Sequence, residues 1–285
     1  MPQLSMSRAI LLACLIAAAA RSFGAGAPTQ DGRQRAASPE ETRLAETLAG
    51  HGVRLDLARG LCSIQAEVVV REDLLEYLLV GPAGSAHETL FLSAVRPSVL
   101  NTALLALGVE PGSNARWTPK DPPIDDEQLR QGISPYDVQL PDGGGFHIYA
   151  GWKQDGEAYF YRVEDLLRNL ATGQSMRRHR WVYLGSSMVP KGRPESGEEA
   201  FAADIYQNLI NIPFFSEGYT LATAALPECI DQTIWMANSW LLPQRGSVVE
   251  LFLSRERIEQ VPAEIAERLP ALAPVPAPPQ DGERR

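Results

Sequence analysis

Turns divide the chain into many short apolar runs, and this division limits it to a small set of folds. The runs at 65–70 and 76–80 are rich in β-branched and aromatic residues, and 81–84 has the composition of a turn. Most connections between such runs look like hairpins or irregular loops, which favours antiparallel pairing over a regular strand-helix alternation. We therefore predict an α+β fold with mainly antiparallel strands and two or three short helices.

Several segments predict particular elements. The extended runs at 143–152 and 157–163, separated by a Gln-Asp-Gly turn, predict a hairpin. Pro97, an apolar face after it and Gly108 as a stop predict one helix. A second short helix is predicted at 163–173, where apolar residues fall on one side. Further strands are expected at 180–184, 200–203, 209–212, 233–237 and 247–253.

Composition separates the ends of the chain from its centre. Residues 1–27 are predicted to be a signal peptide, and 28–44 a polar, flexible lead. Residues 45–258 form the predicted domain, followed by a disordered tail rich in Pro and Ala at 269–285. Residues 118–141, rich in Pro and Asp, are either a seam between two small domains or a long loop on one.

The N-terminus predicts export to the periplasm or the extracellular space. Residues 1–8 carry one positive charge and no acid, residues 9–20 are all apolar, and small residues follow. This apolar run is shorter than the roughly 20 residues that span a bilayer, so we expect no stable membrane span and cleavage between positions 20 and 27. The alternatives are a lipoprotein anchor at Cys14 and a cytoplasmic protein with an apolar start.

Removal of this signal leaves two cysteines, Cys62 and Cys229. An exported chain can join them in a disulfide, or both can be buried free thiols. Their wide separation argues against an iron-sulfur cluster or a structural zinc site, whose ligands are usually closely spaced. We predict no metal and no cofactor.

The acidic balance argues against a nucleic-acid partner. The net charge is −9, and phosphate neutralisation requires clustered Lys and Arg. One basic cluster departs from this trend: Arg177, Arg178, His179 and Arg180. It could hold an anion, a polyanionic polymer or a lipid headgroup, or it is a solvated turn or strand edge.

The pair His87 and Glu88 is the first candidate site. Position 91 is Phe91, so the metalloprotease helix motif is not present. Neighbours on a strand or its lead-in direct their side chains to opposite faces, so the pair could not easily hold one metal. We expect these groups either to satisfy backbone atoms near the 81–84 turn and the N-terminus of the helix that follows, or to bind a ligand or act in acid-base catalysis.

Asp204 and a group of aromatic residues are further candidates. Asp204 follows an apolar strand and is either a site residue or a turn cap. The aromatic residues are either core and cross-strand partners or a sugar-binding platform: Phe146, Tyr149, Trp152, Tyr159, Phe160 and Tyr161. The nucleophile-elbow and nucleotide P-loop templates do not match this sequence.

Residues 75–112, "LEYLLVGPAGSAHETLFLSAVRPSVLNTALLALGVEPG", resemble the signature block of the YdjY-like domain family of bacterial envelope proteins, of planctomycete type. Three later segments are similar to the family as well: "RWVYLGSSM", "AFAADIYQNLINIPFF" and "LPQRGSVVELFL". The resemblance covers about 60–254 and implies an exported single domain of uncharacterised role. Relatives often have a Lys-rich approach to the His-Glu pair, whereas Ser85 and Ala86 precede it here.

Two functions of different class follow from these observations. The first is an exported, non-enzymatic envelope module that binds a protein, a wall polymer or a small ligand. The second is a hydrolase or lyase whose acid-base residues are His87, Glu88 and Asp204. An enzyme should gather at least two of these side chains in a concave pocket, with one titrating abnormally. A module should instead show a flat or apolar exposed patch, and we favour this one.

Overall fold

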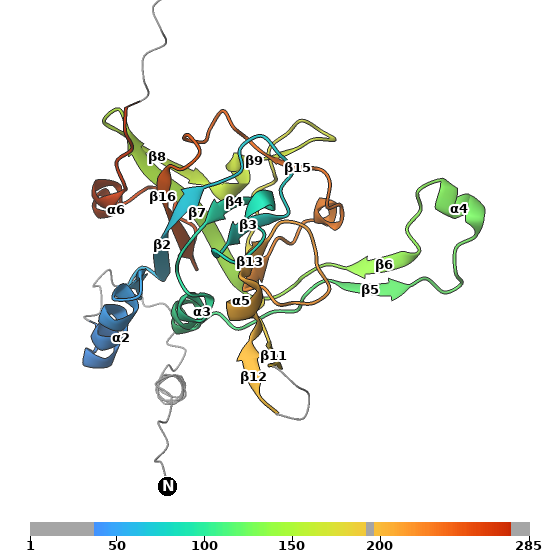
Figure 1. The fold of residues 1–285 in the computed structure, drawn as a ribbon, viewed down its shortest axis with the longest axis horizontal. Helices are drawn as coiled ribbons and strands as arrows, with labels where there is room; N and C mark the ends of the chain where they lie inside the picture. The colour runs from blue at the N-terminus through green and yellow to red at the C-terminus, as the bar shows by residue number, and fades with distance from the viewer. Residues whose placement is uncertain (1–36, 192–196, 275–285) are drawn as a thin grey trace, which may run out of the picture. The chain divides into compact units, whose positions relative to one another are not determined.

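The computed structural model describes residues 37–191 and 197–274, and eight strands in this part close into a barrel (Figure 1). The order runs from β2 (Leu61–Val68) through β16 (Val248–Ser254), β7 (Gly145–Gln154), β10 (Trp181–Tyr183), β14 (Ala222–Thr223), β13 (Asn208–Asn211), β3 (Tyr77–Val80) and β4 (Thr89–Leu92), which returns to β2. Of these pairs, β13–β14 and β3–β4 are parallel and the others antiparallel. The predicted α+β fold with mainly antiparallel strands is confirmed, and closure into a barrel adds to it.

The core fills the inside of this barrel. Alternate residues of each strand face inward, as a closed sheet requires, and they include Ile64, Trp152 and Leu251, each at most 2% exposed. Trp181 and Phe91 are fully buried among them. The functional surfaces therefore lie on the outside of the barrel and at its ends.

Two locally encoded elements form as predicted. The helix α3 (Pro97–Ala106) begins at its proline, and Gly108, with φ +74°, follows its end. The hairpin joins β7 to β8 (Glu157–Arg162) through Asp155 and Gly156, both at positive φ. A two-residue turn of this kind suits the twist of the strands that it connects.

The prediction of a helix at 163–173 is wrong. Only one 3-10 turn forms, η2 (Val163–Leu166), and the chain continues as β9 (Leu167–Asn169), which pairs with β15 (Trp235–Ala237). Leu170, which the helical pattern placed on the apolar face, is 43% exposed. Pairing with a distant strand has overridden the local periodicity.

The described residues contain five α-helices rather than two or three. The helix α2 (Pro39–Ala49) begins inside the predicted 28–44 lead, because Ser38 and Glu41 form a capping box. The helix α6 (Ala263–Arg268) follows the predicted domain end. The other two are short: α4 (Asp126–Arg130) and α5 (Ala202–Tyr206).

Both predicted chain-end boundaries therefore need correction. The lead gives way to a helix at Pro39, and 269–272 pack on the domain, with Leu269 only 4% exposed. The predicted signal peptide, the anchor alternative at Cys14, most of the lead and 275–285 lie outside the described residues.

Residues 118–141 belong to an excursion from one domain and are not a seam. They contribute to an arm of β5 (Arg116–Pro119), α4 and β6 (Tyr136–Gln139), which stands apart from the barrel strands in Figure 1. The chain before and after the arm contributes strands to the same barrel. A smaller hairpin, β11 (Met188–Pro190) and β12 (Glu199–Phe201), precedes α5, and the 3-10 turn η4 (Pro227–Ile230) precedes β15.

A buried carboxylate attaches two outer elements to the barrel. Glu250 is 1% exposed and accepts hydrogen bonds from Arg54 of β1 (Val53–Asp56) at 2.9 Å and from Ser63 at 2.6 Å. Arg268 of α6 lies 3.6 Å from the same carboxylate. This network holds α6, and with it the segment before α6, against the outside of the barrel. No helix in 37–191 or 197–274 is long and apolar enough to cross a membrane.

Candidate functional site

His87 and Glu88 lie on a single 3-10 turn, η1 (Ala86–Glu88), and not on a strand. The prediction that their side chains point to opposite faces is wrong, because the turn brings His87 Nε2 to 3.2 Å from Glu88 Oε1. The His87 side chain is 78% exposed and that of Glu88 36% exposed. The two therefore form a solvent-accessible pair.

Glu76 is the neighbour of this pair in the fold. The sequence pattern predicted only that it lies on the strand at 76–80. The parallel register sets Tyr77 beside Thr89, so Glu76 and Glu88 are neighbours, and Glu76 N–H donates to the Glu88 carbonyl at 2.9 Å. Burial raises the pKa of Glu76, and the Glu88 carboxylate beside it raises this pKa further, while His87 opposes the shift. The parallel pairing of two strands in one short segment had no signal in the sequence.

Asp204 has a structural role in this fold. Its Oδ2 accepts from Arg96 Nε at 2.7 Å and its Oδ1 from the backbone N–H of Ser98 at 2.8 Å, in the first turn of α3. This agrees with the capping alternative. A hollow of about 450 Å³ beside it is lined by Arg96, Asp204, Gln207 and other residues, but not by His87 or Glu88. The three predicted site residues do not form one constellation.

The 81–84 turn is satisfied by Gln207, which follows α5, and by Asn208 of β13, rather than by His87 and Glu88. Gln207 accepts from Gly81 N–H through its carbonyl at 2.7 Å and from Ala83 N–H through its side chain at 2.9 Å. Asn208 Oδ1 accepts from Ser85 N–H at 2.9 Å. The expectation that the His-Glu pair serves this turn is therefore wrong.

Cys62 and Cys229 are both free and both fully buried. Burial raises the pKa of each thiol to about 12, so each stays protonated and unreactive at neutral pH. The disulfide alternative is not realised, and the alternative of two buried thiols describes the pair. Among residues 37–191 and 197–274, no three His, Cys, Asp or Glu side chains are placed to hold a metal ion.

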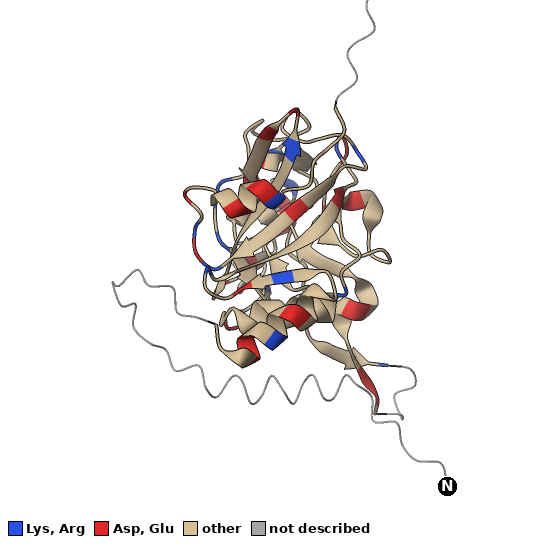
Figure 2. Cartoon of the chain, turned by 90° about the vertical axis from the view of Figure 1, so that its left-hand side faces the viewer, with Lys and Arg blue, Asp and Glu red and all other residues tan. Residues whose placement is uncertain are grey.

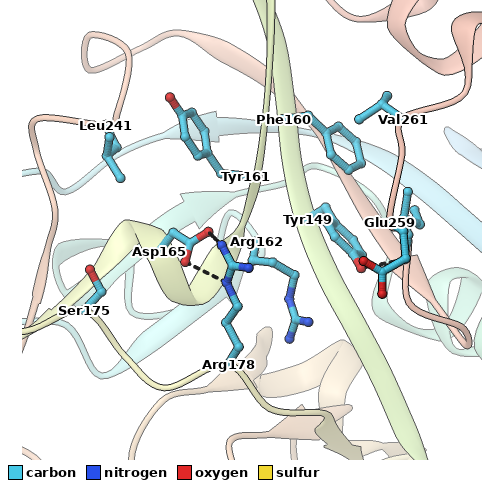
Figure 3. A pocket seen from close by; sticks show the side chains of 11 residues that line it. Tyr149, Phe160, Tyr161, Arg162, Asp165, Ser175, Arg178, Leu241, Glu259 and Val261 are labelled. Atoms are coloured by element: carbon cyan, nitrogen blue, oxygen red, sulfur yellow. Dashed lines mark hydrogen bonds and ion pairs between the residues drawn. The ribbon is translucent and has the colours of Figure 1, made fainter.

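A groove runs beside β8, and we call it the β8 groove. It has a volume of about 430 Å³ and is lined by residues from β7, β8, η2 and three loops (Figure 3): Tyr149, Phe160, Tyr161, Arg162, Asp165, Ser175, Arg178, Leu241, Ile258, Glu259 and Val261. Figure 3 shows Tyr161, Leu241 and Asp165 on one side of the strand, and Phe160, Val261 and Glu259 on the other. The groove therefore extends along the edge of β8 and reaches both faces of the strand.

The charges of the β8 groove are paired within the protein. Arg178 donates to both oxygens of Asp165 at 3.0 and 2.8 Å. Arg162, only 8% exposed, donates to both oxygens of Glu164, which is fully buried, and to the His179 carbonyl. A ligand therefore meets neutralised ion pairs and aromatic rings here, rather than a free charge.

Three of the four members of the basic cluster at 177–180, Arg177, Arg178 and His179, are engaged within the protein, and Arg180 is exposed. Arg177 is bound bidentately by Glu228 at 2.9 and 2.7 Å, as Arg178 is by Asp165. Burial lowers the pKa of His179, which favours the neutral ring at pH 7. Figure 2 shows acidic and basic positions interspersed on the face that it presents. The alternative of a structural, charged strand edge describes this cluster better than anion binding.

The aromatic residues have the predicted cross-strand role. Trp152 faces Tyr159 across the hairpin, with ring centroids 5.8 Å apart, and Tyr149 stacks on Phe160 at 5.1 Å. The Tyr149 hydroxyl also accepts from Ile258 N–H at 2.8 Å, which attaches the 258–261 loop to the sheet. Tyr149, Phe160 and Tyr161 also form walls of the β8 groove. The sequence pattern does not predict this role, because it does not show which loops lie beside them.

Comparison of the chain with protein-family models, with curated proteins and with solved structures found no match.

Proposed function

We propose that this chain is an exported, non-enzymatic module of the bacterial cell envelope and that the β8 groove is its ligand site. The signal-like residues 1–27 and the resemblance of 75–112 to the YdjY-like family support the envelope location. The observation that carries the binding role is the β8 groove itself, in which three aromatic rings and paired charges border the outer edge of a strand. Recognition sites typically combine an aromatic surface with a few oriented polar groups.

An exposed aromatic residue beside the groove adds support. Trp240 is 90% exposed, and the next residue, Leu241, lines the groove. The loop that carries Trp240 is held by Arg71 Nη2, which donates to the Ser239 carbonyl at 2.8 Å. A tryptophan kept in solvent by a well-anchored loop is a typical contact residue of binding surfaces.

The alternative, a hydrolase or lyase, has less support. His87 and Glu88 do lie within reach of each other, and the pKa of Glu76 beside them is raised. Neither described hollow is lined by these residues, however, and both oxygens of Asp204 are bound to α3 and Arg96. The cluster thus has the proton-binding groups of an acid-base site, but it lies outside both of the hollows described.

Site-specific photocrosslinking in the native host tests the proposed function. A benzophenone amino acid replaces Tyr161, which lines the β8 groove, and in a matched control it replaces Tyr136, which is 45% exposed on β6. We expect an adduct from position 161 that position 136 does not give. Digestion with a protease or a muramidase then identifies its partner as protein or wall polymer. The absence of any adduct specific to position 161 would contradict the binding role.

A further inference from the structure

The strand β8 has one neighbour and an open outer edge. Among the residues that the structure describes, it pairs only with β7, through six consecutive residue pairs without a bulge. The turn at Asp155 and Gly156 makes Gln154 and Glu157 the closing pair of the hairpin, which exchanges hydrogen bonds. The backbone N–H and carbonyl groups of alternate residues, starting with Ala158 and then Phe160, therefore point away from β7.

Contacts on the far side of β7 agree with this alternation. Lys153 lies opposite Ala158, and its N–H and carbonyl bond to Pro270 and Leu272, each at 2.8 Å, on the side away from β8. The backbone N–H and carbonyl of Lys153 therefore point away from β8. Those of Ala158, which lies opposite, point away from β7 in the same way. Within 37–191 and 197–274, no backbone hydrogen bond joins Ala158 or Phe160 to a segment other than β7.

This edge lacks the usual protection against pairing. Natural edge strands are commonly interrupted by proline, a bulge or an inward charge, or are covered by another element. The sequence of β8, Glu-Ala-Tyr-Phe-Tyr-Arg, has charges only at its ends, and its register is continuous. An aromatic, regular edge of this kind is suited to receive another strand.

The β8 groove provides space for the side chains of such a strand. Tyr161 and Leu241 offer an apolar surface on one side of the edge, and Phe160 and Val261 offer one on the other (Figure 3). Side chains of an added strand alternate between these two sides. The ion pairs of Arg162 and Arg178 leave no uncompensated positive charge for a polyanion, so the chemistry of the site favours a polypeptide backbone.

We infer that the β8 groove binds an extended segment of a partner polypeptide, without proline and with apolar side chains at successive positions, as a strand added to the edge of β8. This inference rests on the proposed function, because it names the ligand class of the same groove. Backbone hydrogen bonds from Ala158 and Phe160 hold the segment, and the two apolar surfaces select its side chains.

The substitution Ala158→Pro tests this inference, with Ala158→Val as the matched control. Proline removes the outward N–H of Ala158 without removing a bond to β7, and an edge strand tolerates it there. The valine variant keeps the N–H and adds a comparable side chain. Peptides of about nine residues, selected from a random displayed library on the full-length wild type and then synthesised, serve as probes. We expect Ala158→Pro to weaken their binding about tenfold or more, and Ala158→Val to change it by about twofold or less.

N-methylation of the synthetic peptide is a second measurement that requires no change in the protein. Methylation of alternate backbone nitrogens, on the edge that faces β8, should abolish binding, and methylation of the intervening ones should not. Equal effects of both sets, equal affinities of the two Ala158 variants, or a library without binders would overturn strand addition. A wild-type dimer that Ala158→Pro dissociates would reassign the edge to a second copy and also overturn it.

The outcomes separate the two proposals. An adduct at position 161 that contains wall polymer, or a protein adduct that Ala158→Pro leaves at full yield, would retain the binding module and reject strand addition. The absence of an adduct specific to position 161 would reject the binding module itself.

Discussion

Arg162 and Glu164 form a buried ion pair beside the β8 groove. Their side chains are 8% and 0% exposed, and Glu164 also accepts from the backbone N–H of His179 at 3.2 Å. The pair therefore connects the end of β8 to the segment before β10. Both charges lose their hydration in this position, so the contribution of each charge to stability depends on the presence of the other.

Loss of one member of this pair should cost more than loss of both. We expect Glu164→Leu to lower the free energy of unfolding by about 3–5 kcal/mol, because it leaves the Arg162 guanidinium buried without a counter-charge. The double variant Arg162→Leu, Glu164→Leu should be more stable than Glu164→Leu. Urea titration measures both, and a double variant no more stable than the single one would show that the pair is not the source of the effect.

The carboxyl of Glu76 should make stability depend on pH. Burial and Glu88 raise its pKa in the folded chain above the ordinary 4.5, against the effect of His87, so folding favours the protonated form. The stability that this carboxyl contributes is present below pH 4.5 and is lost as the pH rises through the folded pKa. Glu76→Gln should therefore raise the melting temperature by about 1–3 °C near pH 7 and by less near pH 4.

The control for this measurement is Glu67→Gln, at an exposed position of β2. A melting temperature of Glu76→Gln that is lower than wild type near pH 7, or a gain that is equal at both pH values, would show that the carboxyl pair does not oppose folding.

The 81–84 turn is fixed by close packing. A Cβ at Gly84 would lie 2.5 Å from the Gln207 carbonyl oxygen and 2.9 Å from Val80 Cβ, so the backbone would have to move. We expect Gly84→Ala to lower the free energy of unfolding by about 2 kcal/mol or more. Gly50, with φ −61° and a nearest neighbour at 3.4 Å, is the control, and Gly50→Ala should be close to neutral. Denaturant unfolding of the two variants compares them, and equal stabilities would disprove the packing argument.

Elements with local signals could be predicted from the sequence, and those decided by distant contacts could not. The helix after Pro97 and the turn at Asp155 and Gly156 carry their own caps and conformational preferences. The segment 163–173 has helical spacing, yet β15, about 60 residues later, takes β9 into a sheet. The helix α2 is a different case, because the capping box of Ser38 and Glu41 is a local signal for its start, although the polar composition of 28–44 favours a flexible lead.

Closure of the barrel determines which segments line the β8 groove. The pairing of β16 with β2 and with β7 holds the strand that precedes the 258–261 loop in the barrel, and this loop lies beside β8. Tyr149, Phe160 and Tyr161 could be selected as candidates from the sequence because aromatic residues are conspicuous. Leu241 and Val261 could not, because about 80 to 100 residues separate them from β8 and no local pattern marks them.

Strand addition requires that the outward backbone groups of Ala158 and Phe160 are free until a partner strand binds. Amide hydrogen exchange followed by NMR tests it most directly, since a hydrogen-bonded amide exchanges slowly and a solvent-exposed amide quickly. In the unbound protein we expect rapid exchange at 158 and 160 and protection at 159 and 161, which bond to β7. Saturation with a selected peptide should slow exchange at 158 and 160 by about tenfold or more. Protection of both amides before the peptide is added, or unchanged exchange after it, would contradict strand addition at β8.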